Sequence, residues 1–187
     1  MARSTAARGL TKALSVRRAR KRADRYMRLA ARVEPRFGDL LDDQLDREAA
    51  DRLRDFGSRD CAFVDPEATD GLDLVAVLQE VAWRALGLRP HLVQLAAAMA
   101  LHDGHLVQLA TGEGKTLAAI LPAAILASRH DRCHVLTFND YLARRDASWM
   151  KPFFDRLGIS VHAIQATQTP TERRQAYGAQ VTYATAK

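Results

Sequence analysis

The chain has 187 residues, enough for one sizeable domain with an appendage, and its 48% apolar content is ordinary for a globular protein. No stretch approaches the roughly 20 apolar residues of a membrane span, and the basic start is not followed by the apolar core of a signal peptide. The histidines show no metal-binding spacing with cysteine or carboxylate, so no zinc site is expected. Cys61 and Cys133 are expected to be reduced thiols, as in a cytoplasmic protein.

The net charge of +6 is concentrated in residues 1–28, which hold ten basic side chains and one acidic one. The remaining residues therefore carry a net charge of −3. The basic segment is either a solvated helical tail or a segment attracted to anionic lipid headgroups. Nucleic acid would attract it equally well, so charge alone does not choose between these partners.

A helical region is expected at residues 29–88, between the basic segment and residue 89. Apolar periodicity predicts three helices in and before this region: 21–32, 42–56 and 73–86. Asp42 or Asp43 is the expected N-cap of the second helix, and Gly87 is the expected C-cap of the third. Residues 57–70 are expected to form a connecting loop.

From residue 89 onward, apolar runs alternate with helical patterns. The predicted strands are His105–Ala110, Cys133–Phe138, Ser160–Gln165 and Val181–Thr185. The predicted helices are 89–101, 117–127, 139–157 and 169–177, and Trp149, Phe153 and Phe154 are expected to pack in the core. This alternation predicts an α/β domain at residues 89–187, with a parallel sheet and helices on both faces.

The loop between the first of these strands and the next helix predicts a phosphate-binding site. It contains Gly112, Glu113, Gly114, Lys115 and Thr116, and strand, glycine loop, Gly-Lys-Thr and helix is the architecture of a P-loop. The glycines allow the backbone to approach an anion, the lysine reaches the β- and γ-phosphates, and the threonine hydroxyl holds Mg²⁺. The alternative is a strand-to-helix turn that uses glycines only for geometry.

Four runs of residues resemble SecA, the ATPase that drives preproteins through the bacterial SecYEG channel. They are Arg89–Leu95, Thr111–Leu117, Asn139–Asp146 and Tyr177–Thr185. Their order and spacing match the first half of the first nucleotide-binding domain of that family, and the resemblance covers residues 25–187. It implies a P-loop NTPase fold of the helicase-like RecA motor type, and an N-terminal piece of such a motor.

The resemblance also implies roles for individual residues and partners. Gln94 would contact the adenine, Gly112–Thr116 would bind the phosphates of ATP and Mg²⁺, and Lys115 would be catalytic. The implied partners are SecYEG, preproteins and an anionic membrane surface, at the cytoplasmic face of the cell membrane. The family's acidic motif and second motor half are not among the 187 residues, so ATP hydrolysis is expected of a full-length parent and stays open for this chain.

Two other functions remain open from the residues alone. One is a nucleic-acid helicase of the same motor class, although the net charge of −3 beyond residue 28 and the lack of a basic, aromatic platform oppose it, and no nucleic acid is expected as a partner. The other is a nucleotide-binding module without catalysis.

Overall fold

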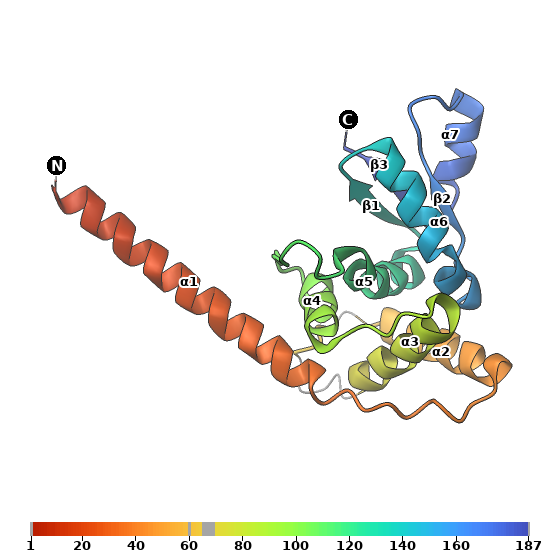
Figure 1. Ribbon diagram of the computed structural model, residues 1–187, viewed down its shortest axis with the longest axis horizontal. Helices are drawn as coiled ribbons and strands as arrows, with labels where there is room; N and C mark the ends of the chain where they lie inside the picture. Colours follow the sequence, from red (N-terminus) through yellow and green to blue (C-terminus); the bar gives the residue numbers. More distant parts are fainter. Residues whose placement is uncertain (1, 60, 65–69, 187) are drawn as a thin grey trace.

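The computed structural model describes residues 2–59, 61–64 and 70–186, with side chains described from residue 16 onward (Figure 1). The helices are α1 (Ala2–Ala30), α2 (Asp42–Gly57), α3 (Gly71–Leu86), α4 (Leu92–His102), α5 (Lys115–His130), α6 (Asp140–Arg156) and α7 (Pro170–Tyr177). The strands are β1 (Cys133–Thr137), β2 (Val161–Ala163) and β3 (Val181–Thr185). Each predicted helix is present, with ends that differ from the predicted ends by a few residues, except that α1 begins far before the predicted residue 21.

The first of the packed helices, α2, buries the apolar stripe that its sequence predicts: Leu45, Ala49, Leu53 and Phe56. The prediction of an aspartate N-cap is wrong. Leu41 is the N-cap, and its backbone N–H donates to the Gln44 side chain at 3.0 Å. Asp42 instead forms ion pairs with Arg84 of α3 and Arg156 of α6, which draw its carboxylate away from the helix end.

Helix α3 begins at Gly71 and ends before Gly87, whose φ of 67° is left-handed and whose N–H donates to the Trp83 carbonyl at 2.9 Å. This confirms the predicted C-cap, since a left-handed residue after a helix favours glycine. The helix packs between α2 and α6. The predicted loop 57–70 lies partly outside the described residues.

The sheet is wholly parallel in the order β1-β3-β2, so β3 is central. Val181 and Tyr183 of β3 are buried in the core together with residues of α5 and α6. Thr182 points to the opposite side, as alternate strand residues do, and its hydroxyl donates to the Ala176 carbonyl of α7 at 3.2 Å. Helices therefore contact both faces, and the predicted α/β class with a parallel sheet is confirmed.

The prediction of a strand at His105–Ala110 is wrong. In the described residues this segment pairs with no strand, although its residues alternate between half-buried and exposed. Leu106 is fully exposed. The His105 N–H donates a hydrogen bond to the Ala100 carbonyl, but this bond closes the end of α4 and does not pair strands. Period-two hydrophobicity specifies an extended backbone, whereas a strand also requires a neighbour that supplies the hydrogen bonds.

Helix α1 projects away from the rest of the molecule and is held only near its C-terminal end (Figure 1). Tyr26 and Ala30 are buried there against α4, and the Tyr26 hydroxyl donates to Asp103 at 2.7 Å. Burial alone would raise the pKa of Asp103, but hydrogen bonds from His102, the Phe63 N–H and Tyr26 lower it below its usual value. Asp103 is therefore charged and joins three segments of the chain.

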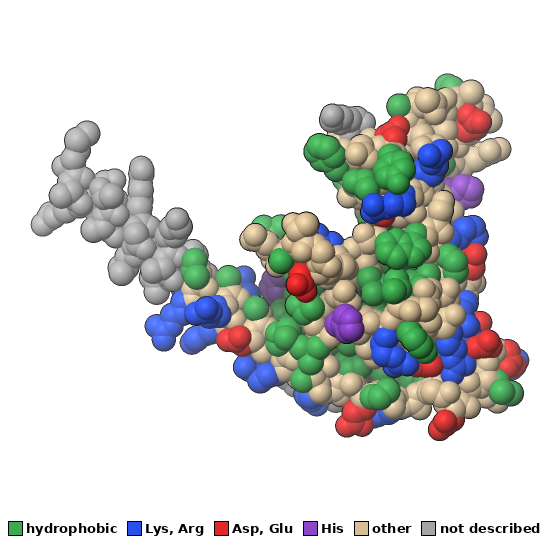
Figure 2. Space-filling view, in the orientation of Figure 1, with side chains coloured by type: hydrophobic (Ala, Val, Ile, Leu, Met, Phe, Trp, Pro, Cys, Tyr) green, Lys and Arg blue, Asp and Glu red, His purple; other side chains and the backbone are tan. Residues whose placement is uncertain are grey.

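Across the part of the chain that the structure describes, no helix has both the length and the apolar character needed to cross a membrane. The exposed residues 16–25 of α1 include six of the basic side chains counted above, so the described part of this helix is strongly cationic (Figure 2).

Candidate nucleotide-binding site

The loop before α5 has the backbone geometry of an anion cradle. Gly112 and Gly114 have φ values of 88° and 70°, in the left-handed region that glycine adopts without strain. Gly114 is the N-cap of α5 and its helix begins at Lys115, with no side-chain cap and no acidic residue in the first turn. The first backbone N–H groups of this 16-residue helix are therefore not claimed by a side chain, which suits them to an anion.

The predicted side chains lie on this cradle. The Lys115 ammonium donates to the Ala110 carbonyl at 2.6 Å, so it is folded over the loop, and it is exposed to solvent. Thr116 is half-buried in the first turn of α5. Glu113 is exposed, and its contribution to the site is its backbone carbonyl, which accepts a hydrogen bond from Gln94.

Gln94 braces the loop from the start of α4. It is 7% exposed; its side-chain oxygen accepts from the His91 N–H at 2.8 Å, and its amide nitrogen donates to the Glu113 carbonyl at 3.0 Å. A β-carbon added at Gly114 would lie 2.2 Å from that nitrogen. The glutamine and the glycine therefore fit against each other, which joins two of the sequence motifs into one site.

A cavity of about 470 Å³ opens beside this contact. Its lining includes Trp83, Arg89, Gln94, Gly114, Thr116 and Trp149. The expectation that Trp149 is a core residue is wrong, because 48% of it is exposed, whereas Phe153 and Phe154 are fully buried as predicted. Helix α6 buries Met150, Phe153 and Phe154 at i, i+3 and i+4, and Trp149 lies just outside that stripe.

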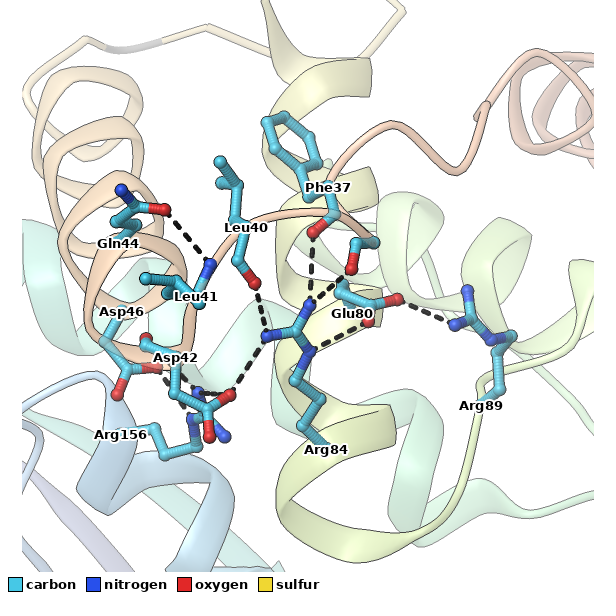
Figure 3. A network of polar contacts seen from close by, with 11 residues as sticks. Phe37, Leu40, Leu41, Asp42, Gln44, Asp46, Glu80, Arg84, Arg89 and Arg156 are labelled. Atoms are coloured by element: carbon cyan, nitrogen blue, oxygen red, sulfur yellow. Dashed lines mark hydrogen bonds and ion pairs between the residues drawn. The ribbon is translucent and has the colours of Figure 1, made fainter.

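Figure 3 shows a network of ion pairs that includes Arg89, one of the residues that line the cavity. The buried Glu80 accepts from Arg89 at 2.7 Å with one oxygen and from Arg84 at 3.0 Å with the other. The Arg89 guanidinium also lies over the Trp83 ring, 5.6 Å from its centroid. The hydrogen bond to Asp42 raises the pKa of Arg84, so its charge persists at any physiological pH.

This part of the cavity was not predicted from the sequence. Arg89 is inside a run that the resemblance had identified, but nothing in the sequence shows that Trp83 and Trp149, 66 residues apart, line the same cavity. The available signal was the i, i+4 spacing of Glu80 and Arg84, which indicates an ion pair on one helix face but no connection to a binding site.

The residues fit Mg²⁺ only as part of a nucleotide complex. The described residues contain no cluster of three or more His, Cys, Asp or Glu side chains able to hold a metal ion. Mg²⁺ in nucleotide sites commonly takes one or two protein ligands and completes its shell with phosphate oxygens and water. The Thr116 hydroxyl, in the first turn of α5, is the side chain here that suits this arrangement.

The chain matches known proteins over most of its length. The family model described as the SecA DEAD-like domain matches residues 10–187. Protein translocase subunit SecA 2 of Thermobifida fusca is 43% identical over 85% of this chain and 20% of the relative. Protein translocase subunit SecA of Cellvibrio japonicus is 41% identical over 88% of this chain and 18% of the relative. SecA 2 of Mycolicibacterium smegmatis is 46% identical over 83% of this chain and 19% of the relative.

The chain thus spans about a fifth of the length of the curated relatives that it matches. The match includes the runs that carry the candidate site, from Arg89 to Thr185, and most of the helices that precede them.

Proposed function

Since this chain belongs to the SecA family, we propose that it binds ATP with Mg²⁺ at residues 111–116, as part of a motor that drives preproteins through the SecYEG channel. The observation that carries the nucleotide proposal is the contact between Gln94 and the loop at Glu113 and Gly114. Two motifs separated by 19 positions meet there, beside a cavity, and the Lys115 ammonium is folded over the same loop.

Each part of the site has a distinct task in this proposal. The N–H groups of the loop and of the first turn of α5 bind the phosphates, and Lys115 exchanges the Ala110 carbonyl for phosphate oxygens. Thr116 contributes a hydroxyl to Mg²⁺, which supplies positive charge to the phosphates when bound. The cavity beside Gln94 receives the adenine.

The cationic part of α1 supports a position at the cytoplasmic face of the cell membrane. Its described basic side chains are exposed and the helix stands away from the rest of the molecule, where a charged surface is able to approach it (Figure 2). Each basic side chain close to an anionic bilayer contributes about 1 kcal/mol. We therefore include anionic lipid among the partners, together with SecYEG and preproteins, and we include no nucleic acid.

The family and the charge both favour translocation over nucleic-acid unwinding. The relatives are named as translocase subunits, and the residues beyond 28 carry a net charge of −3, whereas strand-binding grooves are cationic. Hydrolysis is proposed for the full-length parent of this chain.

The proposal is tested by Lys115→Ala in that full-length parent. ATP turnover is measured with membrane vesicles that contain SecYEG and with a preprotein. Removal of the ammonium takes away charge stabilisation from the transferring phosphoryl group, so turnover should be nearly abolished. Lys151→Ala, at an exposed lysine paired with Asp155 on α6, is the matched control and should leave turnover unchanged.

Near-normal turnover in the Lys115→Ala protein would contradict the assignment of the phosphate loop. Stimulation of the wild type by RNA, and not by vesicles with preprotein, would contradict the translocation function.

The proposed attachment to membranes is tested by sedimentation of the chain with lipid vesicles. Binding to anionic vesicles should exceed binding to neutral ones at low salt and should fall steeply as salt is added, because the attraction is screened. Equal sedimentation with both kinds of vesicle would show that charge does not attach α1 to membranes.

A further inference from the structure

The two tryptophans of the chain line the same cavity. Trp83 comes from α3 and Trp149 from α6, and 46% and 48% of these residues, respectively, are exposed. Isolated apolar residues on a surface are common, but here both tryptophans of the chain lie at one cavity. The cavity lining also contains Gly114 and Thr116 of the phosphate loop.

Both indoles are carried by rigid supports. Helices α3 and α6 pack against each other, and next to Trp149 the buried Met150 anchors α6 in the core. On α3, the buried Glu80 pairs with Arg89 (Figure 3), and the Arg89 guanidinium lies over the Trp83 ring. The indoles are thus presented at the cavity by elements that are already fixed, which lowers the entropic cost of binding a flat ligand.

The chemistry of this wall suits a nucleobase and not a phosphate. The cavity surface that the indoles contribute is aromatic, and the positive charge of Arg89 is neutralised by Glu80 at 2.7 Å. Lys115, on the loop side, has no carboxylate partner in the part of the chain that the structure describes, and its ammonium donates to the Ala110 carbonyl. A nucleoside triphosphate placed with its phosphates on the loop would direct its base toward the tryptophans.

Gln94 alone gives limited affinity for a base, because both ends of its amide already hold protein groups. Its oxygen accepts from the His91 N–H and its nitrogen donates to the Glu113 carbonyl. A hydrogen bond to adenine would have to share these atoms. Stacking needs no such sharing, since every base has an aromatic face and stacking on aromatic side chains is a large part of base affinity in other sites.

We propose that Trp83 and Trp149 form a stacking wall for the nucleobase and supply most of the affinity difference between ATP and a bare polyphosphate. This inference rests on the proposed nucleotide function and adds to it the residues that recognise the base.

The test compares ATP with inorganic tripolyphosphate, both with Mg²⁺, by titration calorimetry on the 187-residue chain. Trp149→Ala should weaken ATP binding about tenfold, the scale of one base-stacking contact, and leave tripolyphosphate binding unchanged. Trp149→Phe should retain most of the ATP affinity. Tyr141→Ala is the matched control, because Tyr141 is an exposed aromatic residue on the same helix outside the cavity.

The outcomes separate this inference from the function on which it rests. Unchanged ATP affinity in both Trp149→Ala and Trp83→Ala, or an equal loss for tripolyphosphate, would overturn the stacking wall. If the wild type binds neither ligand, or if Lys115→Ala weakens neither, the nucleotide function and the wall both fail. If Lys115→Ala weakens the binding of both ligands and the tryptophan variants weaken ATP binding alone, the nucleotide function and the stacking wall are both supported.

Tryptophan emission gives a second readout on the same samples. Because both indoles border the cavity, ATP should change the emission of the wild type, and tripolyphosphate should change it much less. An equal response to the two ligands would count against a base at the wall.

Discussion

The two sides of the candidate nucleotide site are built in different ways. The phosphate side is a single run, Thr111–Thr116, in which neighbours in the sequence are neighbours in space. The base side combines Trp83 and Arg89, at and just after the end of α3, with the distant Trp149, which the packing of α3 against α6 brings to them. The geometry of a local run is set by its glycine dihedral angles and by the start of the next helix. The position of residues from different helices depends instead on how the core packs.

The two sides meet at Gly114, so this glycine is where a substitution should have the largest effect. Gly114→Ala places a methyl group 2.2 Å from the Gln94 amide and forces alanine to a φ of 70°. The left-handed backbone costs about 1–2 kcal/mol, and loss of the Gln94 hydrogen bond costs about 1 kcal/mol more. Urea unfolding should show this loss, and ATP affinity should fall more than tenfold.

Gly112→Ala is the matched control for this effect. Gly112 has a φ of 88°, but nothing lies within 4 Å of an added β-carbon. It should therefore show the backbone cost alone, about 1–2 kcal/mol. Equal destabilisation by the two substitutions would mean that the contact with Gln94 contributes nothing.

Gln94→Ala should have the next largest effect, and it distinguishes a brace from a base-reading residue. The His91 N–H and the Glu113 carbonyl lose their partner, which should cost about 1–2 kcal/mol of the free energy of unfolding. A loosened loop should weaken ATP and tripolyphosphate binding alike, by several-fold. Loss of ATP affinity alone would assign Gln94 to the base side and not to the loop.

Gln168→Ala controls for the general cost of removing such a bridge. Gln168 also accepts a hydrogen bond, from the Gln165 N–H, and donates another, to the Ala163 carbonyl, but it lies far along the chain from the loop. Its loss should lower stability by a similar amount and leave nucleotide binding unchanged. A matching fall in ATP affinity would indicate that global stability, and not the brace, controls binding.

Glu80→Gln should have the smallest effect and acts on the base side alone. The amide keeps the shape of the side chain but loses the charge that holds Arg89 against Trp83. Arg84 keeps Asp42 and backbone carbonyls as partners, so the fold should persist. We expect ATP affinity to fall about threefold with tripolyphosphate binding unchanged.

Glu48→Gln is the control for Glu80→Gln, since Glu48 pairs with Arg52 at the same i, i+4 spacing on α2. It should change neither ligand's affinity. If Glu80→Gln behaves like this control, Arg89 needs no carboxylate to stay at the wall.

The same contrast explains what the sequence predicted. The helices, the C-cap at Gly87 and the strands around β3 follow from apolar periodicity and local turn chemistry, and these were predicted correctly. The prediction that an aspartate caps α2 was wrong because the Asp42 carboxylate pairs with Arg84 and Arg156, which lie 42 and 114 positions away in the sequence. The neighbouring sequence does not show that these distant arginines compete with the helix end for the carboxylate.

Two further errors have the same origin. The segment 105–110 has the apolar alternation of a strand, but strand pairing depends on a neighbour that lies elsewhere in the fold. Trp149 was assigned to the core because a large aromatic residue in a helix is usually buried, yet a shift of one position from Met150 turns it to the cavity. The loop residues come from one local motif and their role in nucleotide binding stays a prediction, whereas their contact with Gln94 depends on how α4 packs against the loop.

The docking of α1 through Asp103 has a mechanical consequence. Asp103 caps the end of α4, and Gln94 lies in the first turn of the same helix. An 11-residue helix spans about 16 Å, so a short rigid rod connects the anchor of α1 with the brace of the phosphate loop. Residues 2–30 form a helix about 43 Å long by the same rise. The anchor of the long helix thus lies about one length of α4 from Gln94, so a displacement of α1 at Asp103 would reach the phosphate loop through a single helix.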